Sequence, residues 1–379
     1  MNEQDVYDVA IIGGGLAGLS LAIQSADYGL KVILFEKEVY PFHKVCGEYI
    51  SLESWNFLQR MGIDLQQLRL PIIKTLELSD AGGSSYQFHL HLGGFGISRF
   101  TLDNSLYTIA LQKGVRVETN SKVNDAIFNN DQFTITSSTV SVKAKIAAGA
   151  FGKRSNIDVK WKRSFTVQKP GALNNYIGIK YHINYSHDPT HIALHNFHDG
   201  YCGLSRIEDD KSCLCYLTTA ANLRSCHNSI AELEERVLYK NPRLKDIFSK
   251  ASFLYEQPIA ISQISFEKKL QVENHALMLG DAAGMISPLC GNGMSMALHS
   301  SKLAFETLSK FLTGDFSRQQ MEEEYTLKWK NQFSKRLWVG RTVQRIFGGN
   351  TSTSLFFKAM HSLPFLSDMV IRSTHGKPF

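Results

Sequence analysis

The first 36 residues constrain the fold of this chain more than any other segment. An apolar run over residues 6–12, expected to be a buried strand, leads directly into Gly13-Gly14-Gly15-Leu16-Ala17-Gly18. An apolar-periodic helix follows, and a second apolar strand over residues 31–35 closes on Glu36. Strand, glycine-rich turn, helix, strand and acid in this order predict the βαβ unit of a doubly wound α/β fold.

The glycines, the helix start and the closing acid of this unit each have a physical role in binding an adenine dinucleotide. Gly13 permits the tight turn, Gly15 lets a pyrophosphate approach the backbone, and Gly18 allows the helix to pack closely on the strand. The helix start, which includes Ala17, offers free N–H groups and a positive dipole end to the phosphates. Glu36 is placed to accept hydrogen bonds from the ribose, and an acid there disfavours a 2′-phosphate. NAD and FAD both remain compatible with this unit.

A second glycine-rich segment lies near the other end of the chain. An apolar run over residues 275–279 delivers Gly280 and Asp281 to a turn, and Pro288 precedes a helix that begins near Gly293. Asp281 at a strand terminus can bind polyol hydroxyls. The backbone from Gly291 through Asn292 and Gly293 to Met294 can present N–H groups and a helix dipole to an anionic ring.

Together the two segments resemble the FAD-dependent superfamily of para-hydroxybenzoate hydroxylase and geranylgeranyl reductase, over roughly residues 6–310. The resemblance implies FAD as the cofactor. The block from Pro41 to Glu48 resembles the Pro-x-x-Lys-x-Cys-Gly block of the geranylgeranyl reductase branch, whose Cys-Gly backbone lies along the flavin. Arg99 and Asp103 resemble the branch's Arg-x-x-x-Asp helix start. The resemblance therefore implies that FAD contacts Gly13, Gly15, Ala17, Gly18, Glu36, Lys44, Cys46, Gly47, Arg99, Val123, Gly280, Asp281, Pro288, Gly291, Asn292, Gly293 and Met294.

Three departures from the family pattern bear on the reaction. Phe151 stands where the family's Gly-Ala-Asp-Gly segment has its acid, so both NAD(P)H and a separate flavin reductase stay open as electron donors. Only Tyr201 survives of the reductase branch's Tyr-x-Trp-x-Phe-Pro strand. The Trp-x-Trp-x-Ile-Pro motif of flavin halogenases is absent, which argues against halogenation.

The central part of the chain has a different pattern, with short alternating segments typical of antiparallel strands. We expect an FAD/NAD(P)-binding Rossmann-like domain of the three-layer ββα, glutathione-reductase type, with an inserted antiparallel β-sheet substrate domain. The expected bounds are residues 1–75, 93–160 and 270–315 for the FAD domain, 76–92 and 161–269 for the sheet domain, and 316–379 for a C-terminal helical tail. A substrate cavity between the two domains would include Tyr201 and Pro288.

Composition limits the range of partners. A net charge of +6 on 379 residues does not indicate nucleic-acid binding. The basic and apolar residues between Lys328 and Arg345 predict an amphipathic helix packed on the body of the protein, with contact to a membrane or an acidic carrier domain as the alternative. Apolar residues after it, among them Phe356 and Phe365, could form a wall of a lipophilic pocket. The histidine and cysteine spacings predict no metal site, and the six cysteines predict reduced thiols in a cytoplasmic protein, or one peripheral to the membrane.

The sequence thus favours an FAD-dependent monooxygenase that hydroxylates a hydrophobic or aromatic secondary metabolite through an oxygen adduct at flavin C4a. Reduction of isoprenoid double bonds is the first alternative, and a non-catalytic flavin-binding redox protein is the second. No residue is singled out as a catalytic acid or base, although His182 and four neighbouring histidines lie near the expected sheet.

Overall fold

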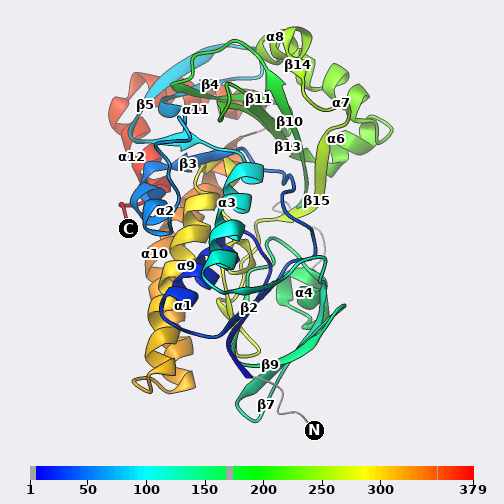
Figure 1. Ribbon diagram of the computed structural model, residues 1–379. Coiled ribbons are helices and arrows are strands. Elements are labelled where there is room, and N and C mark those ends of the chain that lie inside the picture. The colour runs from blue at the N-terminus through cyan, green and yellow to red at the C-terminus, as the bar shows by residue number, and fades with distance from the viewer. Residues whose placement is uncertain (1–5, 168–173, 348) are drawn as a thin grey trace.

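The structure is a computed structural model that describes residues 6–167, 174–347 and 349–379. It has two halves, each built on one sheet (Figure 1). The lower half holds a sheet in the order β16-β17-β9-β1-β2-β6, and β7 and β8 extend it beside β9. Its strands are β1 (Val6–Ile12), β2 (Val32–Phe35), β6 (Arg116–Glu118), β7 (Val123–Asn129), β8 (Gln132–Ser137), β9 (Ser141–Gly149), β16 (Val272–Glu273) and β17 (Ala276–Met278).

Strands β6, β2, β1, β9 and β17 of this sheet run parallel, with β6 at one edge. The four residues of β2 and the three of β17 are all buried, as expected for strands covered on both faces. Helices α1 (Leu16–Asp27), α3 (Arg99–Gln112) and α9 (Gly293–Leu312) pack together beside the sheet. The βαβ unit that the first 36 residues predict is therefore confirmed.

The upper half holds the antiparallel sheet, in the order β14-β10-β13-β12-β11-β4-β5-β3, with β15 paired to β10. The β11–β4 pair is its parallel exception. Its strands are β3 (Tyr49–Ser51), β4 (Ile72–Ser79), β5 (Ser85–Gly96), β10 (Asn174–Asn184), β11 (His191–Phe197), β12 (Gly200–Arg206), β13 (Ser212–Thr219), β14 (Ser252–Phe253) and β15 (Ile259–Ser265). The predicted mixed α/β class, with a parallel sheet and an inserted antiparallel one, is confirmed.

Shorter helices connect and cover these strands. They are η1 (Leu52–Ser54), α2 (Trp55–Arg60), α4 (Asn156–Lys160), α5 (Ser164–Val167), α6 (Ala220–Ser225), α7 (Ile230–Arg236), η2 (Leu238–Lys240), α8 (Pro242–Lys250), η3 (Gly280–Ala282) and η4 (Pro288–Cys290). The domain bounds given above remain a prediction. The antiparallel sheet reaches beyond their 76–92 segment, because it includes β3 and the whole of β4 and β5.

Three helices follow α9 and complete the fold: α10 (Arg318–Ile346), α11 (Asn350–Ser362) and α12 (Pro364–Thr374). A capping box between Ser317 and Gln320 begins α10, and this helix confirms the one predicted between Lys328 and Arg345. α10 packs on α9 and α12, and α11 contacts β5, so the tail joins both halves. Among the described residues, no helix combines the length and the apolar character that crossing a bilayer requires.

Candidate functional site

Two glycines in and after the loop between β1 and α1 leave no room for a side chain. Gly13 has a φ of +109°, and a Cβ there would lie 2.5 Å from the carbonyl oxygen of Ala150. A Cβ on Gly18 would lie 2.0 Å from the carbonyl oxygen of Gly13. Both glycines are therefore required by close backbone approach, as the sequence predicts.

The start of α1 is a ready anion site. Gly15 is its N-cap and provides no capping side chain, so the first N–H groups of the helix have no side-chain partner there. The Arg99 guanidinium and the Lys44 ammonium lie 3.6 and 3.8 Å from where a Gly15 Cβ would be. Asp103 holds both cations, with N–O distances of 2.7 Å to Arg99 and 2.9 Å to Lys44. This cradle of cations and free amides fits a diphosphate.

Glu36 lies at the end of β2, beside the glycine loop. Its Oε2 accepts a hydrogen bond from the Gly14 amide at 2.9 Å, and its Oε1 accepts one from the Glu38 amide at 3.1 Å. The Tyr40 hydroxyl donates to the Gly14 carbonyl oxygen at 2.5 Å. The acid thus lies beside the expected phosphate loop, which is the position that a ribose-binding carboxylate requires.

Asp281 reaches the same region from the second glycine-rich segment. A Cβ on Gly280 would lie 3.4 Å from the Ala17 Cβ, so this segment lies against α1. No hydrogen bond reaches the Asp281 carboxylate from the residues that the structure describes. Burial raises the pKa of Asp281, and the charges of Lys269, Arg99 and Lys153 only partly offset this. A half-buried carboxylate without a protein donor fits a ligand that brings hydroxyl groups.

The turn that ends in α9 has the shape expected of a bed for an anionic ring. Gly291 is left-handed, with a φ of +61°, and α9 begins at Gly293 without a side-chain cap. The Asn292 side chain turns away, because its Nδ2 donates to the Thr374 carbonyl oxygen at 2.7 Å. The Asn292 Nδ2 is therefore not available to a cofactor, and Met294 is buried.

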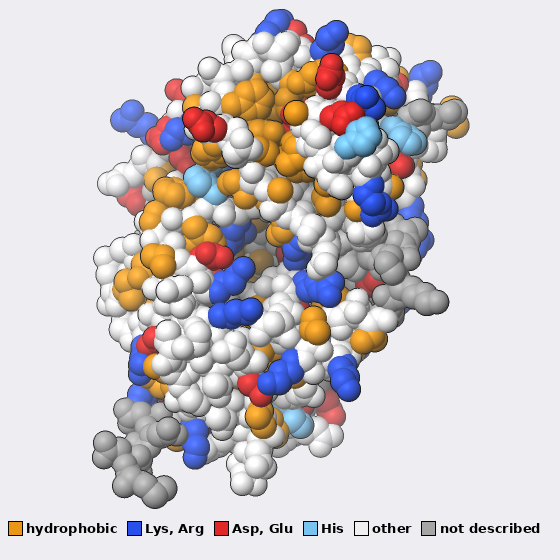
Figure 2. Space-filling model, turned by 90° about the vertical axis from the view of Figure 1, so that its right-hand side faces the viewer, with side chains coloured by type: hydrophobic (Ala, Val, Ile, Leu, Met, Phe, Trp, Pro, Cys, Tyr) orange, Lys and Arg blue, Asp and Glu red, His pale blue; other side chains and the backbone are white. Residues whose placement is uncertain are grey.

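The other predicted contacts lie around these segments. The Cys46 carbonyl oxygen accepts a hydrogen bond from the Cys213 thiol at 3.2 Å, and the Gly47 carbonyl oxygen accepts one from Ser205 at 3.0 Å. Both bonds fix the Cys46–Gly47 backbone on the antiparallel sheet. Val123 begins β7, close to the Ser121 amide that donates to the Glu36 carbonyl oxygen. Figure 2 shows a hollow near the middle of one face, bordered by Lys and Arg side chains.

A buried polar cluster under the Cys46–Gly47 turn is the part of the region that we did not predict. Glu48 has a φ of +55° and no exposed surface. Its Oε1 accepts hydrogen bonds from the Lys180 ammonium at 2.5 Å and from the Arg99 amide at 2.8 Å. Its Oε2 lies 2.6 Å from His182 Nε2, and the Tyr255 hydroxyl bonds to His182 Nδ1. The hint in the sequence was the alternation in β10, which puts Lys180 and His182 on one face.

The protonation of this cluster follows from its contacts. Burial alone would raise the pKa of Glu48, but the hydrogen bond from His182 and the charge of Lys180 outweigh it and hold the pKa below its usual range. Burial would lower the pKa of Lys180, but Glu48 raises it instead. Donor atoms of Glu48, His182 and Cys213 lie within 4.8 Å of one another, as a metal site requires. The Lys180 ammonium already neutralises the carboxylate, so the prediction of no metal site stands as a prediction.

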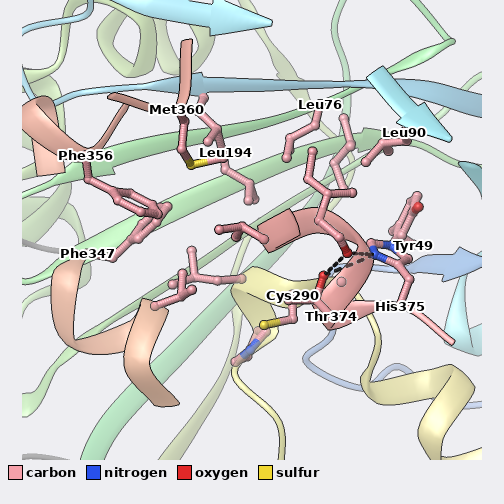
Figure 3. A pocket seen from close by; sticks show the side chains of 18 residues that line it. Tyr49, Leu76, Leu90, Leu194, Cys290, Phe347, Phe356, Met360, Thr374 and His375 are labelled. Atoms are coloured by element: carbon pink, nitrogen blue, oxygen red, sulfur yellow. Dashed lines mark hydrogen bonds between the residues drawn. The ribbon is translucent and has the colours of Figure 1, made fainter. Parts of the chain in front are cut away.

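An apolar pocket lies on the other side of the Pro288–Gly291 turn, between the antiparallel sheet and the C-terminal helices (Figure 3). It encloses about 80 Å³. Its lining residues are Tyr49, Leu76, Leu78, Leu90, Ile192, Leu194, Pro288, Leu289, Cys290, Gly291, Val343, Phe347, Phe356, Met360, Val370, Ile371, Thr374 and His375. Figure 3 shows Tyr49, Thr374 and His375 together at one end, away from Phe347 and Phe356.

Of the two residues predicted for the substrate cavity, Pro288 lines this pocket. Tyr201 lies behind the lining, with its ring 6.3 Å from that of Phe347. The Tyr49 hydroxyl is buried, and among the described residues it has no hydrogen-bond partner. The tip of its ring packs against Gly94, where an added Cβ would lie 2.4 Å from the Tyr49 Cζ, so the unpaired hydroxyl lies at the edge of the pocket.

Replacing Asp281 by alanine is expected to weaken FAD binding about 10- to 100-fold, the equivalent of one or two lost charge-assisted hydrogen bonds. The apoprotein should melt no lower than the wild type, because this carboxylate has no protein donor to lose. Flavin fluorescence quenching and thermal melts measure the two effects. Asp209→Asn, at an exposed ion pair with Lys211, is the matched control and should change neither, because asparagine tolerates the φ of +57° at this position. Unchanged FAD affinity in Asp281→Ala would remove Asp281 from the site.

Comparisons with known proteins agree on one kind of fold. Residues 6–328 match the sequence profile of a family described as FAD binding domain. Conditioned medium factor receptor 1 of Dictyostelium discoideum is 22% identical, over 90% of this chain and 71% of its own length. Digeranylgeranylglycerophospholipid reductase of Methanosarcina acetivorans is 24% identical, over 91% of this chain and 85% of its own. The structure of the flavin-dependent brominase Bmp2 superposes with a TM-score of 0.79 at 18% identity, covering 98% of this chain and 93% of that one.

Proposed function

The chain belongs to the FAD binding domain family of FAD-dependent oxidoreductases, and from this premise we propose that it is a monooxygenase of a lipophilic small molecule. In this reaction one atom of O2 enters the substrate and the other leaves as water. Two electrons from the reduced flavin and two protons complete the balance. The redox chemistry is supplied by FAD when it is bound, and the protein supplies position, electrostatics and exclusion of water.

The observation that carries the proposal is the apolar pocket at the Pro288–Gly291 turn. One side of that turn leads into the start of α9, which is the expected bed for the flavin ring, and the other side lines the pocket. A molecule in the pocket would therefore lie next to the ring. The enclosed volume is small, so a larger substrate needs Phe347, Phe356 or Met360 to move, and methionine adapts readily to such changes.

The polar end of the pocket sets the orientation of the substrate. Burial and the nearby Glu53 raise the pKa of Tyr49, so its phenol stays protonated and can donate a hydrogen bond. The proposed substrate is therefore an apolar molecule with one hydrogen-bond acceptor, which would bond to Tyr49 after a small turn of its ring while the apolar body faces Leu194 and Phe356. Water has few partners among the other lining side chains, which favours a dry reaction site.

Reduction of isoprenoid double bonds is the second candidate. The similarity to a digeranylgeranylglycerophospholipid reductase and the block from Pro41 to Gly47 favour it. The Gly200–Arg206 strand, which keeps only Tyr201 of the branch's aromatic motif, opposes it. A 1H-pyrrole-2-carbonyl-[peptidyl-carrier protein] brominase of Pseudoalteromonas luteoviolacea is also similar in sequence, at 22% identity over 83% of this chain. Halogenation is not proposed, because the Trp-x-Trp-x-Ile-Pro motif is absent.

Product analysis in ¹⁸O2 separates the two candidates. The FAD-loaded protein is reduced chemically and offered lipophilic substrates, with and without oxygen. We expect one ¹⁸O atom in the product and no anaerobic turnover. Saturation of a polyprenyl double bond without oxygen would overturn monooxygenation in favour of reduction.

The electron donor is tested by mixing the FAD-loaded protein with NADPH alone, without oxygen. Because Phe151 stands in place of the family's acid, we expect NADPH to bleach the flavin slowly and turnover to depend on a separate reductase.

A pocket variant tests the substrate site independently of the flavin. Ile192→Phe adds volume inside the pocket and should lower kcat/KM at least tenfold while the flavin spectrum stays unchanged. Ile127→Phe, at an exposed position on β7, is the matched control and should keep wild-type kinetics. Equal turnover by both variants would place the substrate elsewhere.

A further inference from the structure

Helices α11 and α12 are apolar on two faces. Their inner faces contribute Phe356, Met360, Val370 and Ile371 to the lipophilic pocket. The outer surface, which we call the tail surface, consists of Leu355, Leu363, Phe365 and Met369, with exposed fractions of 68, 57, 80 and 48%. The two helices lie side by side at the outer edge of the upper half (Figure 1). Four large apolar side chains in water on one helix pair are unusual for a surface without a binding role.

The C-terminal part of the chain, which comprises most of α10 as well as the tail surface, has an excess of positive charge. Residues 325–379 contain nine Lys and Arg residues and a single acid, Asp368, which gives them a net charge of +8. The whole chain has a net charge of +6, so the rest of it is slightly negative. Lys358 on α11 and Arg372 on α12 are exposed beside the tail surface. Asp368 is paired with His91 at 2.9 Å, which reduces its opposition to an anionic partner.

We propose that the tail surface docks on an anionic lipid bilayer. Phe365, Leu363 and their apolar neighbours would enter the interface between headgroups and acyl chains, and Lys358 and Arg372 would meet the lipid phosphates. The same two helices form one wall of the substrate pocket, so docking would place the pocket directly behind the membrane-bound helices. A role of the docking in substrate delivery rests on the proposed lipophilic substrate, whereas the docking itself does not.

The chemistry of the tail surface favours lipid over an acidic protein. Phe365 and Leu363 project at the junction of two helices, with cations on either side, as in helices that lie in a membrane interface. A protein partner would need an apolar groove of matching shape as well as negative charge. A bilayer offers both an apolar layer and negative charge to any surface that presents protruding apolar groups among cations.

Vesicle sedimentation tests the docking. The full-length protein is mixed with phosphatidylcholine vesicles that contain 30% phosphatidylglycerol, on the order of the anionic content at which basic interfacial segments bind. We expect binding that weakens with salt and is much lower on pure phosphatidylcholine. Phe365→Ser/Met369→Ser should reduce partitioning at least tenfold, from the loss of two buried apolar side chains. Lys358→Gln and Arg372→Gln should each reduce it about fivefold on anionic vesicles only.

Leu327→Ser is the matched control, since Leu327 is 55% exposed on α10 but lies outside the tail surface. It should bind like the wild type. Equal binding of Phe365→Ser/Met369→Ser and the wild type would overturn the proposal, as would no binding to anionic vesicles. Salt-sensitive binding to a purified acidic carrier protein, with no vesicle binding, would assign the surface to a protein and also overturn it. The assay involves no turnover, so its failure leaves the proposed reaction untouched.

Discussion

Replacing Gly18 by alanine is expected to weaken FAD binding about 100-fold, equivalent to about 2.7 kcal/mol. The added Cβ would lie 2.0 Å from the Gly13 carbonyl oxygen and 3.2 Å from the Ala150 Cβ. The Gly13 carbonyl oxygen and the Ala150 Cβ cannot turn aside as the tip of a flexible side chain can. The added Cβ must therefore push α1 away from β1. That shift separates the first N–H groups of α1 from Arg99 and Lys44, which together form the proposed diphosphate cradle. Flavin fluorescence titration of the purified apoprotein measures the loss.

Gly82→Ala is the matched control for this change. Gly82 lies in the turn between β4 and β5, where an added Cβ meets only Asp80 Oδ1, at 3.4 Å. Its affinity for FAD and its melting temperature should match those of the wild type. Gly18→Ala should also melt lower than Gly82→Ala, because overpacking costs about 1–3 kcal/mol. Wild-type FAD affinity in Gly18→Ala would mean that the cofactor does not depend on the position of α1.

The glycine loop was predictable because its constraints are local. A strand, a turn and a helix within 36 residues leave their periods and glycine spacing in the sequence, and the structure confirms them. The helix between Lys328 and Arg345 was predictable for the same reason. The predicted contacts of Cys46, Val123 and the α9 turn with FAD came from family resemblance, and they stay predictions. Asn292 illustrates what the sequence does not reveal, since its side-chain amide donates a hydrogen bond to Thr374, 82 residues away.

The pocket wall was predictable only in part. Apolar composition after residue 350 indicated a lipophilic wall, and Phe356 does line the pocket. Phe365 and Met369, from the same apolar stretch, instead face outward. Composition cannot distinguish the two faces of α11 and α12, because both are apolar and only the packing against β4, β5 and β11 selects the inner one. The buried cluster of Glu48 was harder still, because its partners lie more than 130 residues along the chain.

Replacing Glu48 by glutamine is expected to lower the free energy of unfolding by about 3–5 kcal/mol, because it leaves the Lys180 ammonium buried without a counter-charge. Lys180 has no exposed surface, and Glu48 is the carboxylate paired with it, at 2.5 Å. The double variant Glu48→Gln/Lys180→Met should recover most of the loss, since both charges are then absent. Urea unfolding of the four proteins in this cycle gives the coupling between the two residues.

The pH dependence of unfolding provides the second measurement on Glu48. Its pKa is lower in the folded protein than the usual 4.5, so its stabilisation is complete above pH 4.5 and is lost as pH falls through the folded pKa. The wild type should therefore lose stability below about pH 4.5, and Glu48→Gln should show a shallower loss. Asp103, whose pKa is lowered by Arg99 and Lys44 against the effect of burial, accounts for part of the remaining slope.

Glu256→Gln, at an exposed position, should keep both the stability and the pH profile of the wild type. An unchanged free energy of unfolding in Glu48→Gln would show that Lys180 is not held by this carboxylate, and the cluster would then have no part in fixing the Cys46–Gly47 turn.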